Sequence, residues 1–282
     1  MLGSPIAHSL SPFLHAAAYR ALGLADWSYE AIECDEQGLP SLLGSLGPDW
    51  AGLSLTMPLK RAVLPLLEQA DPVVTDVGAA NTVLLRDGRR LGYNTDVAGL
   101  ATAMRQAGVP LEGNALVLGS GATACSALVA LRETGTWDIT VAVRTLARAE
   151  PLVRVARRLG LSVRLGELSC AGPAGQRALE PALASLPWAL VLSTVPAAGA
   201  DAVAAQVRCG VVTARAVFDV AYDPWPTPLA AAATAAGSTV ISGYEMLVHQ
   251  AAEQVELMTG RRPPIDAMRR AGLAELDRRR NI

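Results

Sequence analysis

The sequence predicts an α/β protein with a mostly parallel sheet. Two observations set the expected number of domains and the expected fold class. At 282 residues, of which 51% are hydrophobic, the chain can fill one or two cores, and we expect two domains. Short apolar runs alternate with helical segments along the chain, as they do in βαβ units.

The first third of the chain combines strands, helices and one hairpin. Asp87-Gly88 indicates the hairpin, because glycine accepts the positive φ of a tight turn. In chain order we expect helix Pro12–Leu22, strand Trp27–Glu33, strand Trp50–Leu55, helix Lys60–Gln69, and hairpin strands Asn81–Leu85 and Arg89–Tyr93.

A second series of elements begins near Gly113, and two C-terminal helices follow it. Pro263-Pro264 separates these last helices, because proline cannot continue one. We expect strand Ala115–Leu118, helix Thr123–Glu133, strand Asp138–Val143, helix Leu146–Leu159, strand Ser162–Leu165, helix Gln176–Leu186, strands Ala189–Ser193 and Ala216–Val220, and helices Gly243–Gly260 and Ile265–Arg279.

Composition excludes several classes of protein. The net charge of −2 and the pI near 6.0 argue against a nucleic-acid partner. The four cysteines form no C-x-x-C pair, and the three histidines lack metal-ligand spacing, so we expect neither a disulfide framework nor a metal site. With no basic stretch before an apolar run at the start and no long apolar segment, we expect a cytoplasmic protein without a membrane partner.

Lys60 is the one lysine among 24 basic residues, the rest being arginine. Lysine can release its proton, whereas arginine stays charged, so an amine at this position would suit proton transfer. The alternative is a surface lysine left in an arginine-rich composition.

A glycine-rich turn at residues 119–124 follows an apolar strand and opens a helix. This is the context in which G-x-G-x-x-G/A binds a pyrophosphate at a helix N-terminus. Arg144-Thr145 ends the next strand, and Arg148 follows one turn later. An arginine here favours NADP, because it can neutralise the 2′-phosphate, although an ordinary strand-end arginine would look the same.

Polar residues gather in a few patches of the apolar chain. Ser9 and Ser11 would point their hydroxyls the same way in an extended loop and hold a carboxylate, while Ser11 before Pro12 would also serve as a helix N-cap. Antiparallel pairing brings Asn81 and Asp96 to the same end of the hairpin. Thr95 or Asp96 could instead cap the following helix. Gln250 lies on a C-terminal helix, one turn from Met246.

Taken in order, these motifs resemble the shikimate dehydrogenase family from Gly3 to about Gly260. The elements that carry the likeness are Gly3–Pro12, Leu55–Lys60, Gly78–Thr82, Gly92–Asp96, the glycine turn, Asp219–Pro224 with Thr227–Leu229, and Gly243–Gln250. Ala122 and Val143 depart from the usual residues, but Arg144 and the implied NADP preference remain.

The resemblance implies an N-terminal α/β substrate domain, a Rossmann-like doubly wound nucleotide-binding domain, and C-terminal helices that return to the first domain. The implied boundaries are residues 1–106, 107–237 and 238–282, with the active site in the cleft between domains. It implies reduction of 3-dehydroshikimate with NADPH by a monomer or homodimer. The alternatives are a quinate/shikimate dehydrogenase of broader substrate or NAD use and a catalytically silent, substrate-binding paralogue.

The resemblance also assigns roles to residues. The implied catalytic pair is Lys60, as proton donor, and Asp96, which orients it. The implied substrate-binding residues are Ser9, Ser11, Thr56, Lys60, Asn81, Asp96, Tyr222 and Gln250. The implied NADP-binding residues are Gly119, Ser120, Gly121, Ala122, Thr123, Arg144, Thr145, Arg148, Val220 and Gly243.

Overall fold

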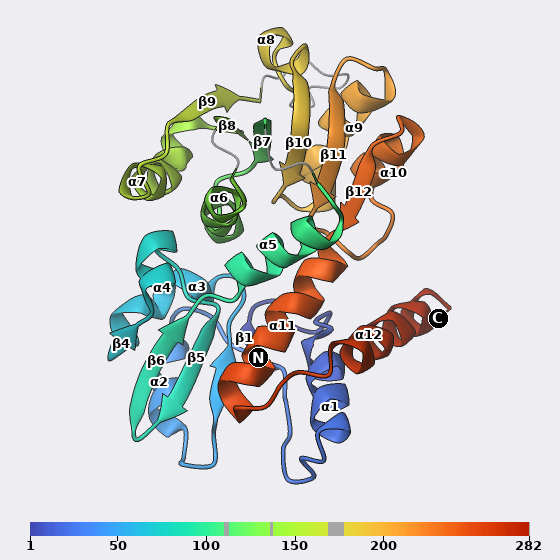
Figure 1. The fold of residues 1–282 in the computed structure, drawn as a ribbon. Helices are drawn as coiled ribbons and strands as arrows, with labels where there is room; N and C mark the ends of the chain where they lie inside the picture. Colours follow the sequence, from blue (N-terminus) through green and yellow to red (C-terminus); the bar gives the residue numbers. More distant parts are fainter. Residues whose placement is uncertain (110–112, 136–137, 169–177, 282) are drawn as a thin grey trace. The chain divides into compact units, whose positions relative to one another are not determined.

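The structure, a computed structural model, describes residues 1–109, 113–135, 138–168 and 178–281 (Figure 1). The chain divides into two compact units. Unit 1 comprises residues 1–99 and 247–282, and unit 2 comprises residues 100–246. The unit boundaries lie inside two helices, α5 (Asp96–Gln106) and α11 (Gly243–Thr259). The predicted domain division at residues 106 and 238 stays a prediction.

Unit 2 contains a six-stranded sheet in which every neighbouring pair is parallel. Its spatial order is β12-β11-β10-β7-β8-β9, the doubly wound order in which the chain runs outward from β7 in both directions. The predicted α/β fold class is confirmed. The strands are β7 (Asn114–Leu118), β8 (Asp138–Val143), β9 (Val163–Glu167), β10 (Pro187–Ser193), β11 (Thr213–Asp219) and β12 (Thr239–Ser242).

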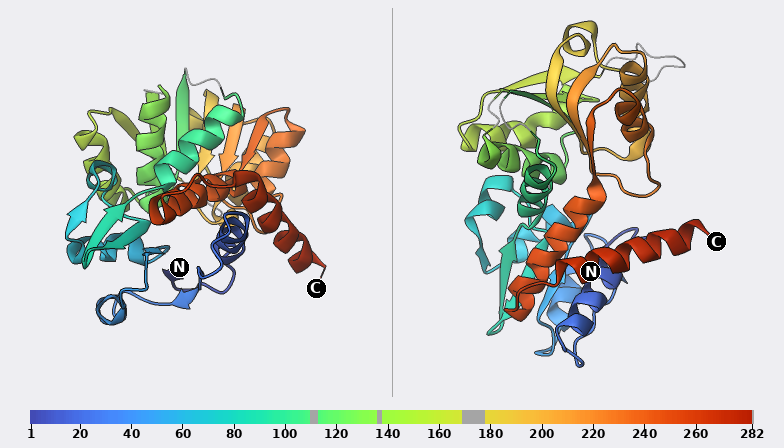
Figure 2. Two further views of the ribbon diagram at one scale, coloured as in Figure 1. Left: turned by 60° about the horizontal axis from the view of Figure 1, so that its bottom comes forward. Right: turned by 45° about the vertical axis from the view of Figure 1, so that its right-hand side comes forward.

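Helices cover both faces of this sheet, as Figure 2 shows for the α6–α7 pair and the α9–α10 pair. Side chains alternate between the two faces of a strand. Leu116, Leu118 and Val191 therefore share one face, and they pack in one core with α9 and α10. The helices are α6 (Ala122–Thr134), α7 (Glu150–Arg158), α8 (Pro181–Ala184), α9 (Asp201–Arg208) and α10 (Pro228–Ala235), with 3₁₀ turns η2 (Leu146–Ala149) and η4 (Ala197–Ala200).

Unit 1 has two small sheets. In one, β1 (Leu2–Gly3) pairs parallel with β2 (Ile32–Glu33), and a bridge from Leu2 to Leu55 joins β1 to the end of the next strand. The other has the order β3-β5-β6-β4, with the predicted hairpin at its centre. Its strands are β3 (Gly52–Ser54), β4 (Gln69–Ala70), β5 (Thr82–Arg86) and β6 (Arg89–Tyr93).

The helices of unit 1 include its N-terminal and C-terminal segments. Helix α1 (Ser11–Ala21) packs along α12 (Ile265–Arg280). The remaining helical segments are α2 (Leu39–Ser45), α3 (Leu59–Ala62), α4 (Pro72–Val77) and the 3₁₀ turn η1 (Leu64–Leu66).

Prolines explain two differences from the sequence-based expectations. The predicted helix Lys60–Gln69 ends with α3 at Ala62, because the ring of Pro65 clashes with the carbonyl four residues earlier. The predicted helix Leu146–Leu159 begins as a 3₁₀ turn, and the α-helix starts at Glu150 with Pro151 in its first turn.

Three further expectations are corrected. The predicted strand Trp27–Glu33 shrinks to β2, because a strand needs a paired neighbour and β1 is two residues long. Of the predicted helix Gln176–Leu186, the start lies outside the described residues, and of the rest only the short α8 (Pro181–Ala184) is helical. Ser11 is not an N-cap: α1 begins at Ser11 itself, after Leu10, with no side-chain cap.

Four helices and two strands were not expected from the sequence. Two of the helices, α4 and α10, nonetheless carry plain start signals. Asp71 and Thr227 cap them with their side chains, and a proline follows each cap. The unexpected elements are α2, α4, α9, α10, β4 and β12.

Among the described residues, Cys34, Cys125 and Cys209 form no disulfide, and Cys170 lies outside the described residues. Across the part of the chain that is described, no helix has the length and apolarity to cross a membrane, and no group of acidic, histidine or cysteine side chains would bind a metal.

Trp188→Ala tests the core of unit 2. Trp188 is 1% exposed, and its indole N–H donates to Leu183 O at 3.2 Å. We expect the substitution to lower the free energy of unfolding by about 3–5 kcal/mol, through lost packing and a cavity. Urea unfolding measures this. Leu165→Ala is the control, because that side chain is 40% exposed. Equal losses for both variants would contradict the assignment of Trp188 to the core.

Candidate functional site

Lys60 and Asp96 form a close ion pair within unit 1. Lys60 lies on α3 and Asp96 is the first residue of α5. Lys60 Nζ donates to Asp96 Oδ2 at 2.5 Å, and the two side chains are 15% and 4% exposed. An ammonium and a carboxylate withdrawn from water in this way interact strongly, because solvent screens them little. Lys60 is thus no freely solvated surface lysine.

Backbone hydrogen bonds hold the Lys60 loop in place. Leu59 N donates to Thr56 O at 2.8 Å and closes the turn in front of α3. Ala80 N donates to Lys60 O at 2.8 Å, and Leu55 N donates to Asn81 O at 2.7 Å. The loop that carries lysine is therefore tied directly to the segment that carries Asn81.

Asn81 connects the ion pair to its surroundings. Its Nδ2 lies 2.8 Å from Asp96 Oδ1, 2.9 Å from Thr95 Oγ1 and 3.3 Å from Gln250 Oε1. Its Oδ1 accepts from Thr95 N at 2.8 Å. The hairpin register pairs Thr82 with Tyr93, so the prediction that Asn81 and Asp96 meet at one end of the hairpin is confirmed.

The carboxylate of Asp96 is directed into this cluster, although the residue begins a helix. Its two oxygens accept from Lys60 and Asn81. Asn94 Oδ1 accepts from Asp96 N at 3.1 Å, and Asn94 Nδ2 donates to Ala79 O at 2.8 Å. Asn94 therefore holds the backbone of Asp96, while the Asp96 side chain bonds to Lys60 and Asn81.

The two serines differ in exposure. Ser11 is 1% exposed in the first turn of α1, whereas Ser9 is partly exposed. Ser9 Oγ accepts from Ser11 N at 3.2 Å and donates to Met1 Sδ at 2.9 Å. Thr56, which is partly exposed, has its backbone N–H bonded to Leu2 O.

A buried polar layer, formed by Gln254, Ser54, Thr82 and His15, contacts the cluster through Gln250. The sequence interpretation did not single it out. Gln254 is 1% exposed and contacts Thr82, Gln250, Ser54 and His15. One signal was available: Gln254 lies four residues after Gln250, on the same face of a helix.

His15 belongs to the same layer. Burial lowers the pKa of its imidazole to about 3, so the ring is neutral near neutral pH. Tyr29 stacks on it with ring centroids 3.9 Å apart, and Tyr19 OH lies 3.4 Å from Nδ1.

In unit 2 the glycine turn lies at the switch point of the sheet, where β7 neighbours β10. Gly119 has φ +107°, and a Cβ there would lie 2.7 Å from Thr194 Oγ1. Gly121 precedes α6, and a Cβ on it would meet no atom within 4 Å. Backbone close to the sheet and open space at a helix N-terminus fit a bound pyrophosphate.

The remaining residues of the predicted nucleotide site follow neighbouring strands. Ser120, Ala122 and Thr123 are part of the turn and the first turn of α6. Arg144, Thr145 and Arg148 are exposed beyond the end of β8, the strand next to β7. The carboxyl ends of parallel strands meet at one edge of the sheet, so the turn and the arginines share that edge.

Val220 and Gly243 are in direct contact. A Cβ on Gly243 would lie 1.9 Å from Val220 O, so this position requires glycine. Val220 N donates to Ser193 O at 3.0 Å, which places it beside the end of β10.

Tyr222 lies in the loop after β11. The buried carboxylate of Asp219, at the end of β11, accepts hydrogen bonds from two residues of this loop. Thr227 Oγ1 donates to Asp219 Oδ2 at 2.7 Å, and Ala221 N donates to Oδ1 at 3.2 Å. Burial raises the pKa of Asp219, and the hydrogen bond from Thr227 opposes that shift. Tyr222 belongs to unit 2, whereas the other predicted substrate-binding residues belong to unit 1.

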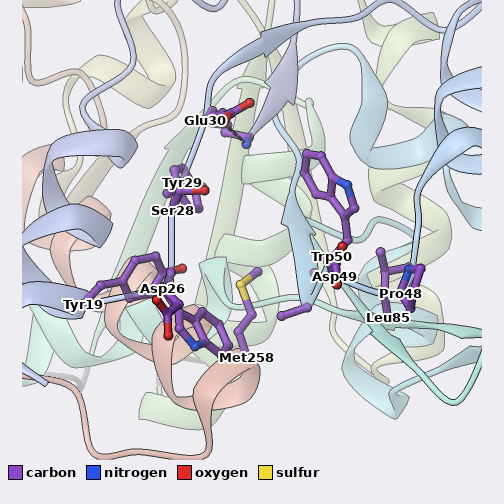
Figure 3. A pocket seen from close by; sticks show the side chains of 14 residues that line it. Tyr19, Asp26, Ser28, Tyr29, Glu30, Pro48, Asp49, Trp50, Leu85 and Met258 are labelled. Atoms are coloured by element: carbon purple, nitrogen blue, oxygen red, sulfur yellow. Dashed lines mark hydrogen bonds between the residues drawn. The ribbon is translucent and has the colours of Figure 1, made fainter. Parts of the chain in front are cut away.

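Unit 1 also contains a hollow of about 600 Å³, lined by aromatic and acidic side chains (Figure 3). Its lining includes Trp27 and Glu30, which precede β2, and Trp50, which precedes β3. Ser9, Thr56 and Lys60 instead follow the carboxyl ends of β1 and β3. The hollow contains none of the predicted site residues.

Comparison with known proteins gives two family matches. Residues 1–83 match the family model described as the shikimate dehydrogenase substrate binding domain, and residues 243–271 match the shikimate 5′-dehydrogenase C-terminal domain. A shikimate dehydrogenase (NADP(+)) from Methanocella arvoryzae is 36% identical over 274 residues, which cover 96% of each chain.

Solved structures agree. The Mycobacterium tuberculosis shikimate dehydrogenase is 44% identical with a TM-score of 0.81, covering 97% of each chain. The Thermus thermophilus shikimate 5-dehydrogenase in complex with NADP(H) and shikimate is 34% identical with a TM-score of 0.78, again covering 97% of each chain. With such identity over nearly its whole length, the chain belongs to the shikimate dehydrogenase family.

Proposed function

We propose that this protein catalyses the reversible NADPH-dependent reduction of 3-dehydroshikimate to shikimate, a step toward chorismate and the aromatic amino acids. The observation that carries this proposal is the partly buried Lys60–Asp96 ion pair, to which Asn81 is hydrogen-bonded. A protein that only bound a ligand would have no need for a proton donor at this position. Relatives that cover 96% and 97% of the chain are named shikimate dehydrogenase.

Substrate recognition is assigned to polar groups of unit 1 together with Tyr222. Ser9 and Ser11 would bind the carboxylate of the substrate through their hydroxyls, with Tyr222 assisting. Four further side chains would bind ring hydroxyls: Thr56, Asn81, Asp96 and Gln250. The cluster of Asn81, Asp96 and Gln250 supports this role, because three polar side chains converge there.

Nucleotide binding is assigned to unit 2. Residues 119–123 would hold the pyrophosphate at the N-terminus of α6, with Val220 and Gly243 beside the nicotinamide. Arg144, Thr145 and Arg148 would bind the adenosine 2′-phosphate, which favours NADP over NAD.

Lys60 is the proposed proton donor. The chemistry that NADPH supplies when bound is a hydride for the C3 carbonyl carbon. The carbonyl oxygen gains negative charge as its π bond breaks, and the Lys60 ammonium both stabilises that charge and transfers a proton to the oxygen. Asp96 holds the ammonium in position. In the oxidative direction, Lys60 accepts the same proton from the C3 hydroxyl.

Steady-state assays with shikimate and quinate, each with NADP⁺ and NAD⁺, test the proposal. We expect turnover of shikimate with NADP⁺ to dominate. Efficient use of quinate with NAD⁺ would favour the broader dehydrogenase, and no turnover with any pair would favour a silent paralogue. We further propose a cytoplasmic monomer or homodimer with the domain division given above.

Lys60→Ala tests the proton donor. We expect kcat to fall by about two to four orders of magnitude with little change in KM, the usual scale of acid–base catalysis. Lys60→Arg keeps the charge and removes the transferable proton, so we expect a similar loss. Arg61→Ala, an exposed cation on the same helix, is the control. Near-normal kcat in Lys60→Arg would show that charge alone suffices.

Arg144→Ala tests the cofactor preference. We expect KM for NADP⁺ to rise about 10- to 100-fold while KM for NAD⁺ changes little, because charge-assisted hydrogen bonds to the 2′-phosphate are lost. The control is Arg154→Ala on α7, where the arginine pairs with Glu150 at 2.9 Å. Equal changes for the two cofactors would contradict the assignment.

A further inference from the structure

The hydrogen bonds of the candidate site have a direction that can be traced from Asp96. An ionised carboxylate only accepts hydrogen bonds, so the Asn81 atom 2.8 Å from Asp96 Oδ1 is the amide nitrogen. A backbone N–H only donates, so the Asn81 atom that faces Thr95 N at 2.8 Å is the amide oxygen. Both neighbours require the same orientation of the Asn81 amide.

The orientation of Asn81 decides that of Gln254. Thr82 Oγ1 lies 2.8 Å from Asn81 Oδ1, so the threonine hydroxyl directs its one proton there. Toward Gln254, 3.0 Å away, Thr82 Oγ1 can then only accept. The Gln254 atom that faces Thr82 is therefore the amide nitrogen.

Gln254 in turn decides the orientation of Gln250. The second proton of Gln254 Nε2 is directed to Gln250 at 3.1 Å, which requires the oxygen of the Gln250 amide at that place. Asn81 Nδ2 approaches the same oxygen at 3.3 Å. Gln250 Nε2 is left on the other side, where it donates one proton to Leu247 O at 3.1 Å and has a second to offer.

The far side of Gln254 fits the same orientation. Its Oε1 accepts from Ser54 Oγ at 2.8 Å and lies 3.3 Å from His15 Nε2. His15 is neutral, with its pKa lowered to about 3, so a proton on Nε2 leaves Nδ1 to accept from Tyr19 OH. All four hydrogen-bonding positions of the Gln254 amide are thus occupied, in a residue that is 1% exposed.

We propose that Gln254 is a positioning residue that fixes the Gln250 amide with its N–H, rather than its C=O, toward the substrate. This inference rests on the proposed function, in which Gln250 binds a ring hydroxyl. A free amide would present either end, because rotation about its last side-chain bond costs little. Held in one orientation, Gln250 offers a donor to the hydroxyl oxygen, and the orientation is set before substrate arrives.

Gln254→Glu is the central test, since it keeps the shape and replaces the donating nitrogen by oxygen. Gln250 would then turn its own nitrogen toward the introduced carboxylate and present oxygen to the substrate. We expect KM for shikimate to rise about 10-fold or more while kcat changes less than about 3-fold, because ground-state binding is lost and the proton donor is untouched. Glu253→Gln, an exposed neighbour with the reverse exchange, is the matched control.

A double-mutant cycle with Gln250→Ala shows whether Gln254 acts through Gln250. If it does, adding Gln254→Glu to Gln250→Ala will raise KM no further than about 2-fold. Effects that multiply, or an unchanged KM in Gln254→Glu alone, would overturn the proposal. A wild-type protein that does not turn over shikimate would overturn the proposed function as well, so the two failures are distinguishable.

Gln254→Met is a second test of the same role, and it applies if the glutamate variant does not fold. It is similar in length and has no amide, so the Gln250 amide is released, and we expect KM to rise with kcat nearly kept. Circular dichroism and thermal unfolding identify which variants are folded. If neither Gln254→Glu nor Gln254→Met folds, Gln254 serves the stability of the fold, and the positioning role is rejected.

Discussion

The carboxylate of Asp96 is the fixed point of the candidate site. It accepts from Lys60 on one side and from Asn81 on the other, and it cannot donate while ionised. That single restriction determines which end of Asn81 faces which neighbour. Through Thr82 and Gln254, the same restriction reaches Gln250. The negative charge of Asp96 thereby sets the hydrogen-bond direction of a chain of neutral amides and hydroxyls.

Burying an ion pair and several amides costs desolvation free energy, so substitutions within this cluster are poorly tolerated. The Lys60 and Asp96 side chains give up most of their water, and their mutual attraction offsets that loss only while both remain. Buried amides carry a similar risk, because each unmet donor or acceptor keeps its full desolvation cost. Within unit 1 the polar atoms of Asn81 and Gln254 are matched on every side, which favours a rigid site over an adaptable one.

In unit 2 the candidate nucleotide site depends on two positions that have no room for a Cβ atom, and not on a buried charge. Gly119 and Gly243 bring backbone against backbone or against a neighbouring side chain, where any Cβ would collide. Both follow the carboxyl ends of strands of the sheet, Gly119 after the central strand β7 and Gly243 after the edge strand β12. In a doubly wound sheet the ligand crevice opens at this edge. The fold thus places bare peptide groups at the edge where Arg144 and the N-terminus of α6 also lie.

The sequence by itself determined the α/β class, most strands of unit 2, the hairpin and the glycine turn, because these follow from local periodicity and from residues with special φ. It also indicated Lys60, Asn81 and Asp96 as a group. It did not determine β2, whose length depends on its partner, or the break at Pro65 between α3 and η1. Tertiary structure alone decided the hydrogen-bond directions through Gln254 and His15, since these join residues some 200 positions apart whose contacts no local pattern encodes.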